Sequence, residues 1–111
     1  VLTKSFDKLH FTLALSYGSR SEIVNAIKKI SKNISLLTEE DIAKSLMTKN
    51  IPDPDLVIRT SGEMRLSNFL LWQVAYSELY FTKTLWPDFS TQKYVLALKN
   101  YINRKRRFGG D

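Results

Sequence analysis

The stretch DLVIRTSGEMRLSN, residues 55–68, places a short apolar run directly before a polar loop. The run LVI is typical of a strand that is buried on both faces of a parallel sheet. It ends at Arg59, and Arg65 and Ser67 follow in the loop. Ligands bind beyond the carboxyl ends of the strands in open parallel sheets. The stretch therefore predicts a strand at 55–59 and a ligand site at the end of that strand.

The polar residues of this loop have the chemistry of an anion site. The guanidinium groups of Arg59 and Arg65 can each bind a pair of phosphate oxygens, and Ser67 adds a hydroxyl group. A helix expected after the loop would add backbone N–H groups and the positive end of its dipole. We therefore favour a phosphate or diphosphate as the ligand. Two local alternatives stay open: Arg59 could pair with Glu63 or Asp55, and Ser67 could simply cap a helix.

The rest of the chain alternates between strand and helix patterns. Residues 9–17 alternate apolar and polar side chains, which is typical of a strand. Helices are expected from Ser19, with Glu22 completing a capping box, and from Thr38, with Asp41 near its start. Three further elements are expected: a buried helix at 69–76 capped by Ser67 or Asn68, a strand at 77–82, and a last helix from Ser90 or Thr91.

This order of elements predicts an α/β fold, a parallel sheet with flanking helices and right-handed crossovers. About three strands are expected, fewer than doubly wound sheets usually have. We therefore expect the chain, which begins at Val1 without a methionine, to be part of one domain. Large aromatic residues are expected in its core, namely Phe69, Trp72, Trp86 and Phe89.

The composition excludes several classes of protein and of site. The chain of 111 residues has a formal net charge of +6, which suggests an anionic partner. No apolar run reaches the length of about 18 residues that a membrane span needs. With no cysteine and one histidine, disulfides, thiolate metal sites and multi-histidine sites are excluded. A bound cation would be a hard one such as Mg²⁺. No motif supports nucleic-acid binding, so nucleic acid is not an expected partner.

Glu78 is the candidate metal ligand. It interrupts the apolar run VAYSELYF, where an unpaired carboxylate is costly to bury. A partner arginine would explain its position. A place beside a bound phosphate, where the carboxylate and the phosphate oxygens share Mg²⁺, would explain it equally well.

Two long stretches carry a resemblance to a known family. DPDLVIRTSGEMRLSNFLLWQVAYSELYF, residues 53–81, is followed by LWPDF and by a terminal RRFGG. Together they closely resemble the C-terminal half of the cis-prenyltransferases, the family of undecaprenyl diphosphate synthase or isoprenyl transferase. LALSYGSRSEI, residues 13–23, resembles the family's NYGGR stretch, although Ser16 replaces the usual Asn and Ser19 a usual Gly. The resemblance implies a cis-prenyltransferase-like fold, with residues 1–111 as the C-terminal part of a single domain.

The resemblance implies a transferase that elongates prenyl chains. Such an enzyme condenses isopentenyl diphosphate repeatedly onto an allylic diphosphate such as farnesyl diphosphate, with cis double bonds, Mg²⁺ and release of diphosphate. The product would be a long-chain polyprenyl diphosphate such as undecaprenyl diphosphate, a membrane-associated lipid carrier for cell-wall synthesis. The enzyme would be a cytoplasmic homodimer with at most peripheral membrane contact.

The resemblance also implies roles for individual residues. The residues that match the family's isopentenyl diphosphate site are Arg59, Arg65, Leu66 and Ser67. Glu78 matches the family's magnesium ligand. The terminal motif places Arg107 and Gly109 where the family completes its site, often across a dimer interface.

One family segment has no counterpart in this chain. The family's DGNGR segment carries the aspartate that coordinates Mg²⁺ and the loop that holds the allylic diphosphate. The resemblance therefore implies that this chain holds no catalytic residue and is inactive alone. The alternative is a non-catalytic partner subunit of a heteromeric cis-prenyltransferase. Retention of Arg59, Arg65, Ser67 and Glu78 favours the catalytic lineage.

Overall fold

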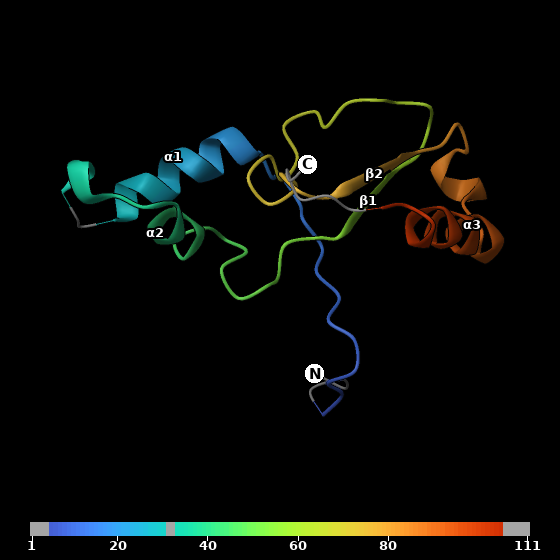
Figure 1. Cartoon of the computed structure of the whole chain (residues 1–111), viewed down its shortest axis with the longest axis horizontal. Helices are drawn as coiled ribbons and strands as arrows, with labels where there is room; N and C mark the ends of the chain where they lie inside the picture. Colours follow the sequence, from blue (N-terminus) through green and yellow to red (C-terminus); the bar gives the residue numbers. More distant parts are fainter. Residues whose placement is uncertain (1–4, 31–32, 106–111) are drawn as a thin grey trace.

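A two-stranded parallel sheet lies between two groups of helices in the computed structural model (Figure 1). The structure describes residues 5–30 and 33–105. Its elements are α1 (Ser19–Lys29), η1 (Ile34–Leu36), α2 (Glu39–Ala43), β1 (Leu56–Arg59), β2 (Glu78–Phe81), η2 (Trp86–Asp88) and α3 (Thr91–Ile102). Helices α1 and α2 lie on one side of the sheet and α3 on the other (Figure 1). The predicted α/β class with a parallel sheet and flanking helices is confirmed.

Strands β1 and β2 pair in parallel along their whole length. Leu56 lies opposite Glu78, and Arg59 lies opposite Phe81. The pairing continues beyond the strands, because the N–H of Thr82 donates to the carbonyl of Arg59 at 2.9 Å. The carboxyl ends of both strands therefore lie at one edge of the sheet, and the loop after Arg59 begins there.

The strand predicted at 9–17 is wrong for this structure. The segment contains no strand, and its apolar side chains are exposed, Leu9 by 82% and Phe11 by 83%. Figure 1 shows the segment running away from the sheet. A strand needs hydrogen-bond partners for its backbone, and none of the residues that the structure describes pairs with this one. The expected three strands are therefore two within the described ranges.

The helix predicted at 69–76 is also wrong. The segment forms a series of turns, although the N–H of Val74 still donates to the carbonyl of Leu70 at 3.0 Å. The reason is in the backbone: Ser67, Asn68 and Leu70 have φ values of 48°, 64° and 47°. A right-handed helix cannot contain such residues. Neither Ser67 nor Asn68 therefore caps a helix in this segment.

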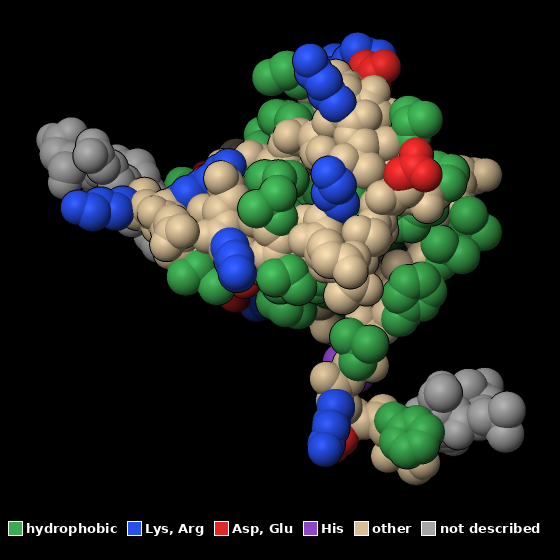
Figure 2. Space-filling model, turned by 90° about the vertical axis from the view of Figure 1, so that its right-hand side faces the viewer, with side chains coloured by type: hydrophobic (Ala, Val, Ile, Leu, Met, Phe, Trp, Pro, Cys, Tyr) green, Lys and Arg blue, Asp and Glu red, His purple; other side chains and the backbone are tan. Residues whose placement is uncertain are grey.

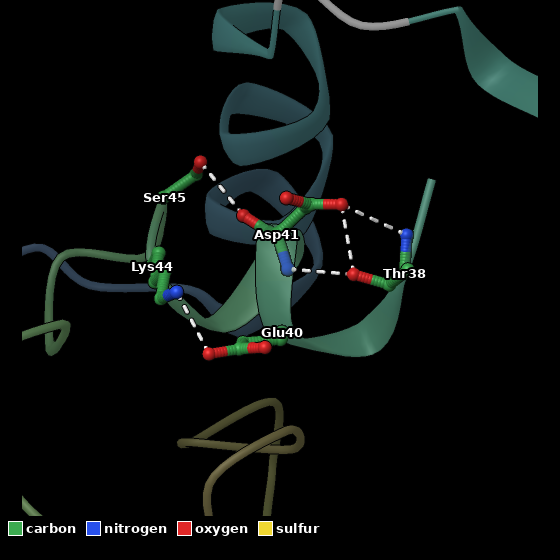
Figure 3. A network of polar contacts seen from close by, with 5 residues as sticks. All are labelled: Thr38, Glu40, Asp41, Lys44 and Ser45. Carbon is green, nitrogen blue, oxygen red and sulfur yellow. Dashed lines mark hydrogen bonds and ion pairs between the residues drawn. The ribbon is translucent and has the colours of Figure 1, made fainter. Parts of the chain in front are cut away.

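The helix starts predicted near Ser19 and Thr38 are both found, but the capping box is not where it was predicted. Thr38 and Asp41 form one at the start of α2, since the Asp41 N–H donates to Thr38 Oγ1 at 3.2 Å and the Thr38 N–H donates to Asp41 Oδ2 at 3.1 Å (Figure 3). The capping box predicted for Ser19 and Glu22 at the start of α1 is wrong. Gly18 is the N-cap residue of α1, and Ser19 and Glu22 are both buried.

The buried core is small. Among the described residues, its apolar members are Ala26, Leu46, Val74 and Ala97. Of the aromatic residues expected in the core, Trp86 is 73% exposed and Phe69 is 42% exposed, whereas Trp72 and Phe89 are half-buried. Figure 2 shows hydrophobic side chains spread over the surface between Lys and Arg side chains. The Cα radius of gyration is 16.7 Å, against about 13 Å for a compact domain of this length. Much apolar surface therefore faces outward.

Candidate anion site at the end of strand β1

Arg59 is held in place by the loop that follows it. Its Nη1 donates to the carbonyl of Arg65 and to Ser67 Oγ, the latter at 3.1 Å. Among residues 5–30 and 33–105, its Nε and Nη2 have no hydrogen-bond partner. The guanidinium group is thus fixed by one nitrogen, and its other donors are available to a ligand.

Arg65 lies on the same cavity as Arg59. An open cavity of about 230 Å³ is lined by Val57, Ile58, Arg59, Arg65, Leu66, Phe69 and Phe81. Arg65 Nη1 forms an ion pair with Glu63, and its side chain is 67% exposed. Glu63 is therefore a partner of Arg65, and the pairing of Glu63 with Arg59 that the sequence left open does not occur. The structure brings together Arg59, Arg65 and Leu66 around the cavity, with Ser67 bound to Arg59.

The helix dipole expected at this site is absent because no helix follows the loop in the described structure. The loop backbone instead includes left-handed residues at Ser61, Gly62 and Ser67, with φ values of 67°, 73° and 48°. Such conformations are uncommon outside glycine and require support from their surroundings. Any anion bound here would therefore depend chiefly on the two guanidinium groups.

A second, larger cavity lies next to the first. It has a volume of about 340 Å³ and is lined mainly by apolar side chains, among them Leu13, Leu15, Ile51, Phe69 and Leu70. Phe69 lines both cavities. A polar cavity with two arginines therefore adjoins an apolar one.

Glu78 lies at the opposite end of the sheet from Arg59. It is opposite Leu56 in the register and three residues before Phe81, so it lies about 10 Å along the strand from the arginine end. Its Oε2 accepts from Arg104 Nη1 at 2.7 Å. Arg104 also donates to the carbonyl of Leu79 at 2.9 Å. This contact supports the explanation that Glu78 lies in the apolar run because an arginine pairs with it.

The described residues do not by themselves form a magnesium site. No group of three or more His, Asp or Glu side chains in the described ranges is arranged to hold a metal ion. Glu78 offers one carboxylate, and Arg104 already neutralises it. The assignment of Glu78 to Mg²⁺ stays a prediction. Arg107 and Gly109 lie outside the described residues.

The Glu78–Arg104 pair makes a testable contribution to stability. We expect Arg104→Ala to lower the free energy of unfolding by about 1 to 2 kcal/mol, because the pair is only partly exposed to solvent. Urea denaturation of the full-length protein measures this change. The exposed neighbour Lys105 is the control, and Lys105→Ala should change stability by less than about 0.5 kcal/mol. Equal curves for both variants would contradict a stabilising role of the pair.

The metal assignment can be separated from the ion pair by activity measurements. If Glu78 binds Mg²⁺, Glu78→Gln raises the Mg²⁺ concentration needed for half-maximal turnover and Arg104→Ala does not. If its role is the ion pair alone, neither variant changes the Mg²⁺ dependence.

A buried polar cluster around Glu22 was not predicted from the sequence. This side chain is 5% exposed and accepts hydrogen bonds from the Tyr17 hydroxyl, the Met47 N–H at 2.8 Å and Gln73 Nε2 at 3.2 Å. Burial raises the pKa of the Tyr17 hydroxyl, and its hydrogen bond to Glu22 raises it further. The one signal in the sequence was helical spacing. Glu22 lies three residues after Ser19 and four before Ala26, and these three are the buried positions of α1.

Comparison with protein families gives a match over nearly the whole chain. Residues 1–109 match a prenyltransferase family described as "Putative undecaprenyl diphosphate synthase". An isoprenyl transferase of Thermotoga maritima is 54% identical, over 97% of this chain and 48% of the relative. The chain spans about half the length of the curated relatives it matches.

Solved structures of similar fold agree with this match. Lavandulyl diphosphate synthase from Lavandula x intermedia, solved with dimethylallyl diphosphate, is 42% identical with a TM-score of 0.86, over 93% of this chain and 48% of that one. A "probable undecaprenyl diphosphate synthase" from Campylobacter jejuni is 40% identical with a TM-score of 0.76, over 86% of this chain and 45% of that one. The two-stranded sheet and its helices therefore have counterparts in larger prenyl diphosphate synthases.

Proposed function

Because the chain belongs to the undecaprenyl diphosphate synthase family of cis-prenyltransferases, we propose that it supplies the isopentenyl diphosphate-binding part of such an enzyme. The chain spans about half the length of its relatives, so the activity is proposed for the full-length protein. Residues 1–111 would form the C-terminal part of its single catalytic domain. The substrates would be isopentenyl diphosphate and an allylic diphosphate such as farnesyl diphosphate, and the product a long-chain polyprenyl diphosphate.

The shared cavity of Arg59 and Arg65 carries this proposal. A diphosphate needs several charge-assisted donors, and two guanidinium groups at the carboxyl edge of a parallel sheet offer them. Ser67 Oγ, which accepts from Arg59, can donate its own hydroxyl proton to a phosphate oxygen. The adjoining apolar cavity favours a ligand in which a hydrocarbon is attached to the anion.

The residues of this chain would act by positioning isopentenyl diphosphate and neutralising its charge. In the reaction, the allylic C–O bond breaks and its diphosphate leaves. The isopentenyl double bond then forms the new C–C bond, and loss of a proton restores a double bond. Holding the diphosphate of the nucleophile fixes the distance between the reacting carbons, which converts binding energy into rate. Mg²⁺ would assist the leaving group when bound, through ligands beyond those that the described residues assemble.

Partners and location stay proposals. A homodimer, a cytoplasmic enzyme with at most peripheral membrane contact, and a membrane-associated product are expected from the family resemblance. In the described ranges, none of the helices has the length and apolar character that crossing a membrane requires.

Turnover of the full-length protein tests the proposal. Radiolabelled isopentenyl diphosphate and farnesyl diphosphate should give a labelled polyprenyl product, and Arg65→Ala should raise the KM for isopentenyl diphosphate about 10-fold or more. Lys44→Ala is the matched control, because Lys44 is also an exposed cation in an ion pair, with Glu40 at 2.7 Å on α2. It should leave the kinetics unchanged.

The same assay separates the alternatives. Turnover that appears only when a second protein is added indicates the partner-subunit role. Equal KM values for Arg65→Ala and Lys44→Ala would remove Arg65 from the site. The residue 1–111 chain alone is expected to give no product.

A further inference from the structure

The N-terminus of α1 is capped by a residue from a distant part of the chain. No side chain adjacent to the helix caps it. Instead, the backbone carbonyl of Asn68 accepts from the Ser19 N–H at 2.8 Å, and Asn68 Oδ1 accepts from the Arg20 N–H at 2.9 Å. The first N–H groups of a helix have no partner inside the helix. Asn68 therefore supplies, across 48 positions of sequence, what an N-cap residue normally supplies locally.

Gly18 and Ser19, at the start of α1, pack closely against the segment that contains Asn68. A Cβ on Gly18 would lie 2.9 Å from Asn68 Nδ2, although Gly18 has φ −148°, which any residue adopts. Glycine at this position therefore gives the Asn68 side chain room to approach, and its backbone freedom is not required. Ser19 is fully buried, and its Oγ accepts from the Leu71 N–H at 2.9 Å. Helix α1 thus fixes both Asn68 and Leu71.

The same contact is connected to the anion site. Asn68 directly follows Ser67, and both have left-handed φ values, 64° and 48°. Asparagine tolerates this conformation better than most residues, whereas serine does so less readily. Ser67 Oγ in turn accepts from Arg59 at 3.1 Å. A continuous series of contacts therefore runs from α1 through Asn68 and Ser67 to the guanidinium group.

We propose that Asn68 is a positioning residue for isopentenyl diphosphate: its cap on α1 fixes the loop conformation in which Ser67 and Arg59 meet the diphosphate. This inference rests on the proposed function of the site. Asn68 does not line the arginine cavity itself. It acts by ordering the loop before the substrate arrives, so that substrate binding does not have to order it.

Substitutions of Asn68 should separate positioning from general stability. Asn68→Ala removes the side-chain cap, and kcat/KM for isopentenyl diphosphate should fall about 10-fold or more, because a small displacement of positioning groups is costly. The KM for farnesyl diphosphate should stay within about 2-fold, since the proposed function assigns this loop to isopentenyl diphosphate alone. Asn68→Asp keeps an acceptor oxygen at the helix N-terminus and should restore most of the activity.

Gly18→Ala provides a second, independent route to the same displacement. It leaves Asn68 in place but pushes against its side chain, which the bond to Arg20 holds. It should reproduce the loss seen for Asn68→Ala. The matched control is Asn33→Ala, because Asn33 caps η1 through a 3.2 Å bond from the Ser35 N–H and does not line the arginine cavity. This control should leave the kinetics unchanged.

Amide hydrogen exchange without substrate tests the cap itself. Asn68→Ala should speed exchange at Arg20, whose N–H bonds the Asn68 side chain, more than at Ser19, whose N–H bonds the Asn68 backbone. Asn33→Ala should speed neither. Unchanged exchange at Arg20 would overturn the side-chain cap. Faster exchange with unchanged isopentenyl diphosphate kinetics would overturn the positioning role while leaving the proposed function intact. A wild-type protein without turnover would reject the proposed function and the positioning role together, whereas exchange would still report the cap.

Discussion

Replacing Arg59 with alanine is expected to lower kcat/KM for isopentenyl diphosphate about 100-fold, because hydrogen bonds to charged groups contribute about 1.5 to 3 kcal/mol each. The effect should exceed that of Arg65→Ala. Arg59 is half-buried and fixed by Ser67, whereas Arg65 is 67% exposed and shares its charge with Glu63. Steady-state kinetics of the full-length enzyme, with each substrate varied in turn, measure the change.

Two further variants interpret the result. Arg59→Lys keeps the positive charge but loses the planar fork, so it should recover only part of the activity if paired donors matter. Lys93→Ala removes one positive charge from the exposed surface of α3 and should have no effect. If Arg59→Ala matched Lys93→Ala, the diphosphate would not bind at the end of β1.

Replacing Glu22 with alanine is expected to lower the free energy of unfolding by about 3 kcal/mol, because each buried polar group left without a partner costs about 1 to 3 kcal/mol. The carboxylate accepts from Tyr17, Met47 and Gln73, which come from three separate segments of the chain. Domains are stable by only about 5 to 15 kcal/mol, so the loss should be visible as a large shift of the urea midpoint.

Glu39→Ala is the control for Glu22, since Glu39 is an exposed glutamate in the first turn of α2. Surface changes of this kind usually alter stability by about 0.5 kcal/mol or less. Glu22→Gln, which keeps one acceptor oxygen, should lie between the two. A loss for Glu22→Ala no larger than that for Glu39→Ala would show that water replaces the carboxylate without cost.

The elements around Arg59 were predictable because their signals are local. The apolar run before Arg59 predicted a strand, and β1 covers Leu56–Arg59. The pattern at Thr38 and Asp41 predicted the start of a helix from residues three positions apart, and these two residues form the N-terminal cap of α2 (Figure 3). The parallel arrangement was predicted from the alternation of strand and helix patterns, and β1 and β2 pair in parallel.

The segment after the loop was not predictable from its pattern. FLLWQVAY has the composition of a buried helix, but Leu70 has φ 47° and the segment forms turns. What holds it there are contacts with α1, above all the bond from the Leu71 N–H to Ser19 Oγ. Local propensity is a weak preference, and tertiary contacts of this kind override it.

By itself, the amino-acid sequence determined the family, the strand that ends at Arg59 and the candidate site residues in the loop that follows this strand. These depend on hydrophobic order and on side-chain chemistry within a short stretch. Only the tertiary structure decided that Asn68 caps α1, that Arg104 neutralises Glu78 and that Glu22 joins three segments. Each of these contacts joins a polar group to a partner more than twenty positions away, and those of Glu78 and Glu22 are partly buried. The partner depends on how the backbone folds in space, and no local pattern records it.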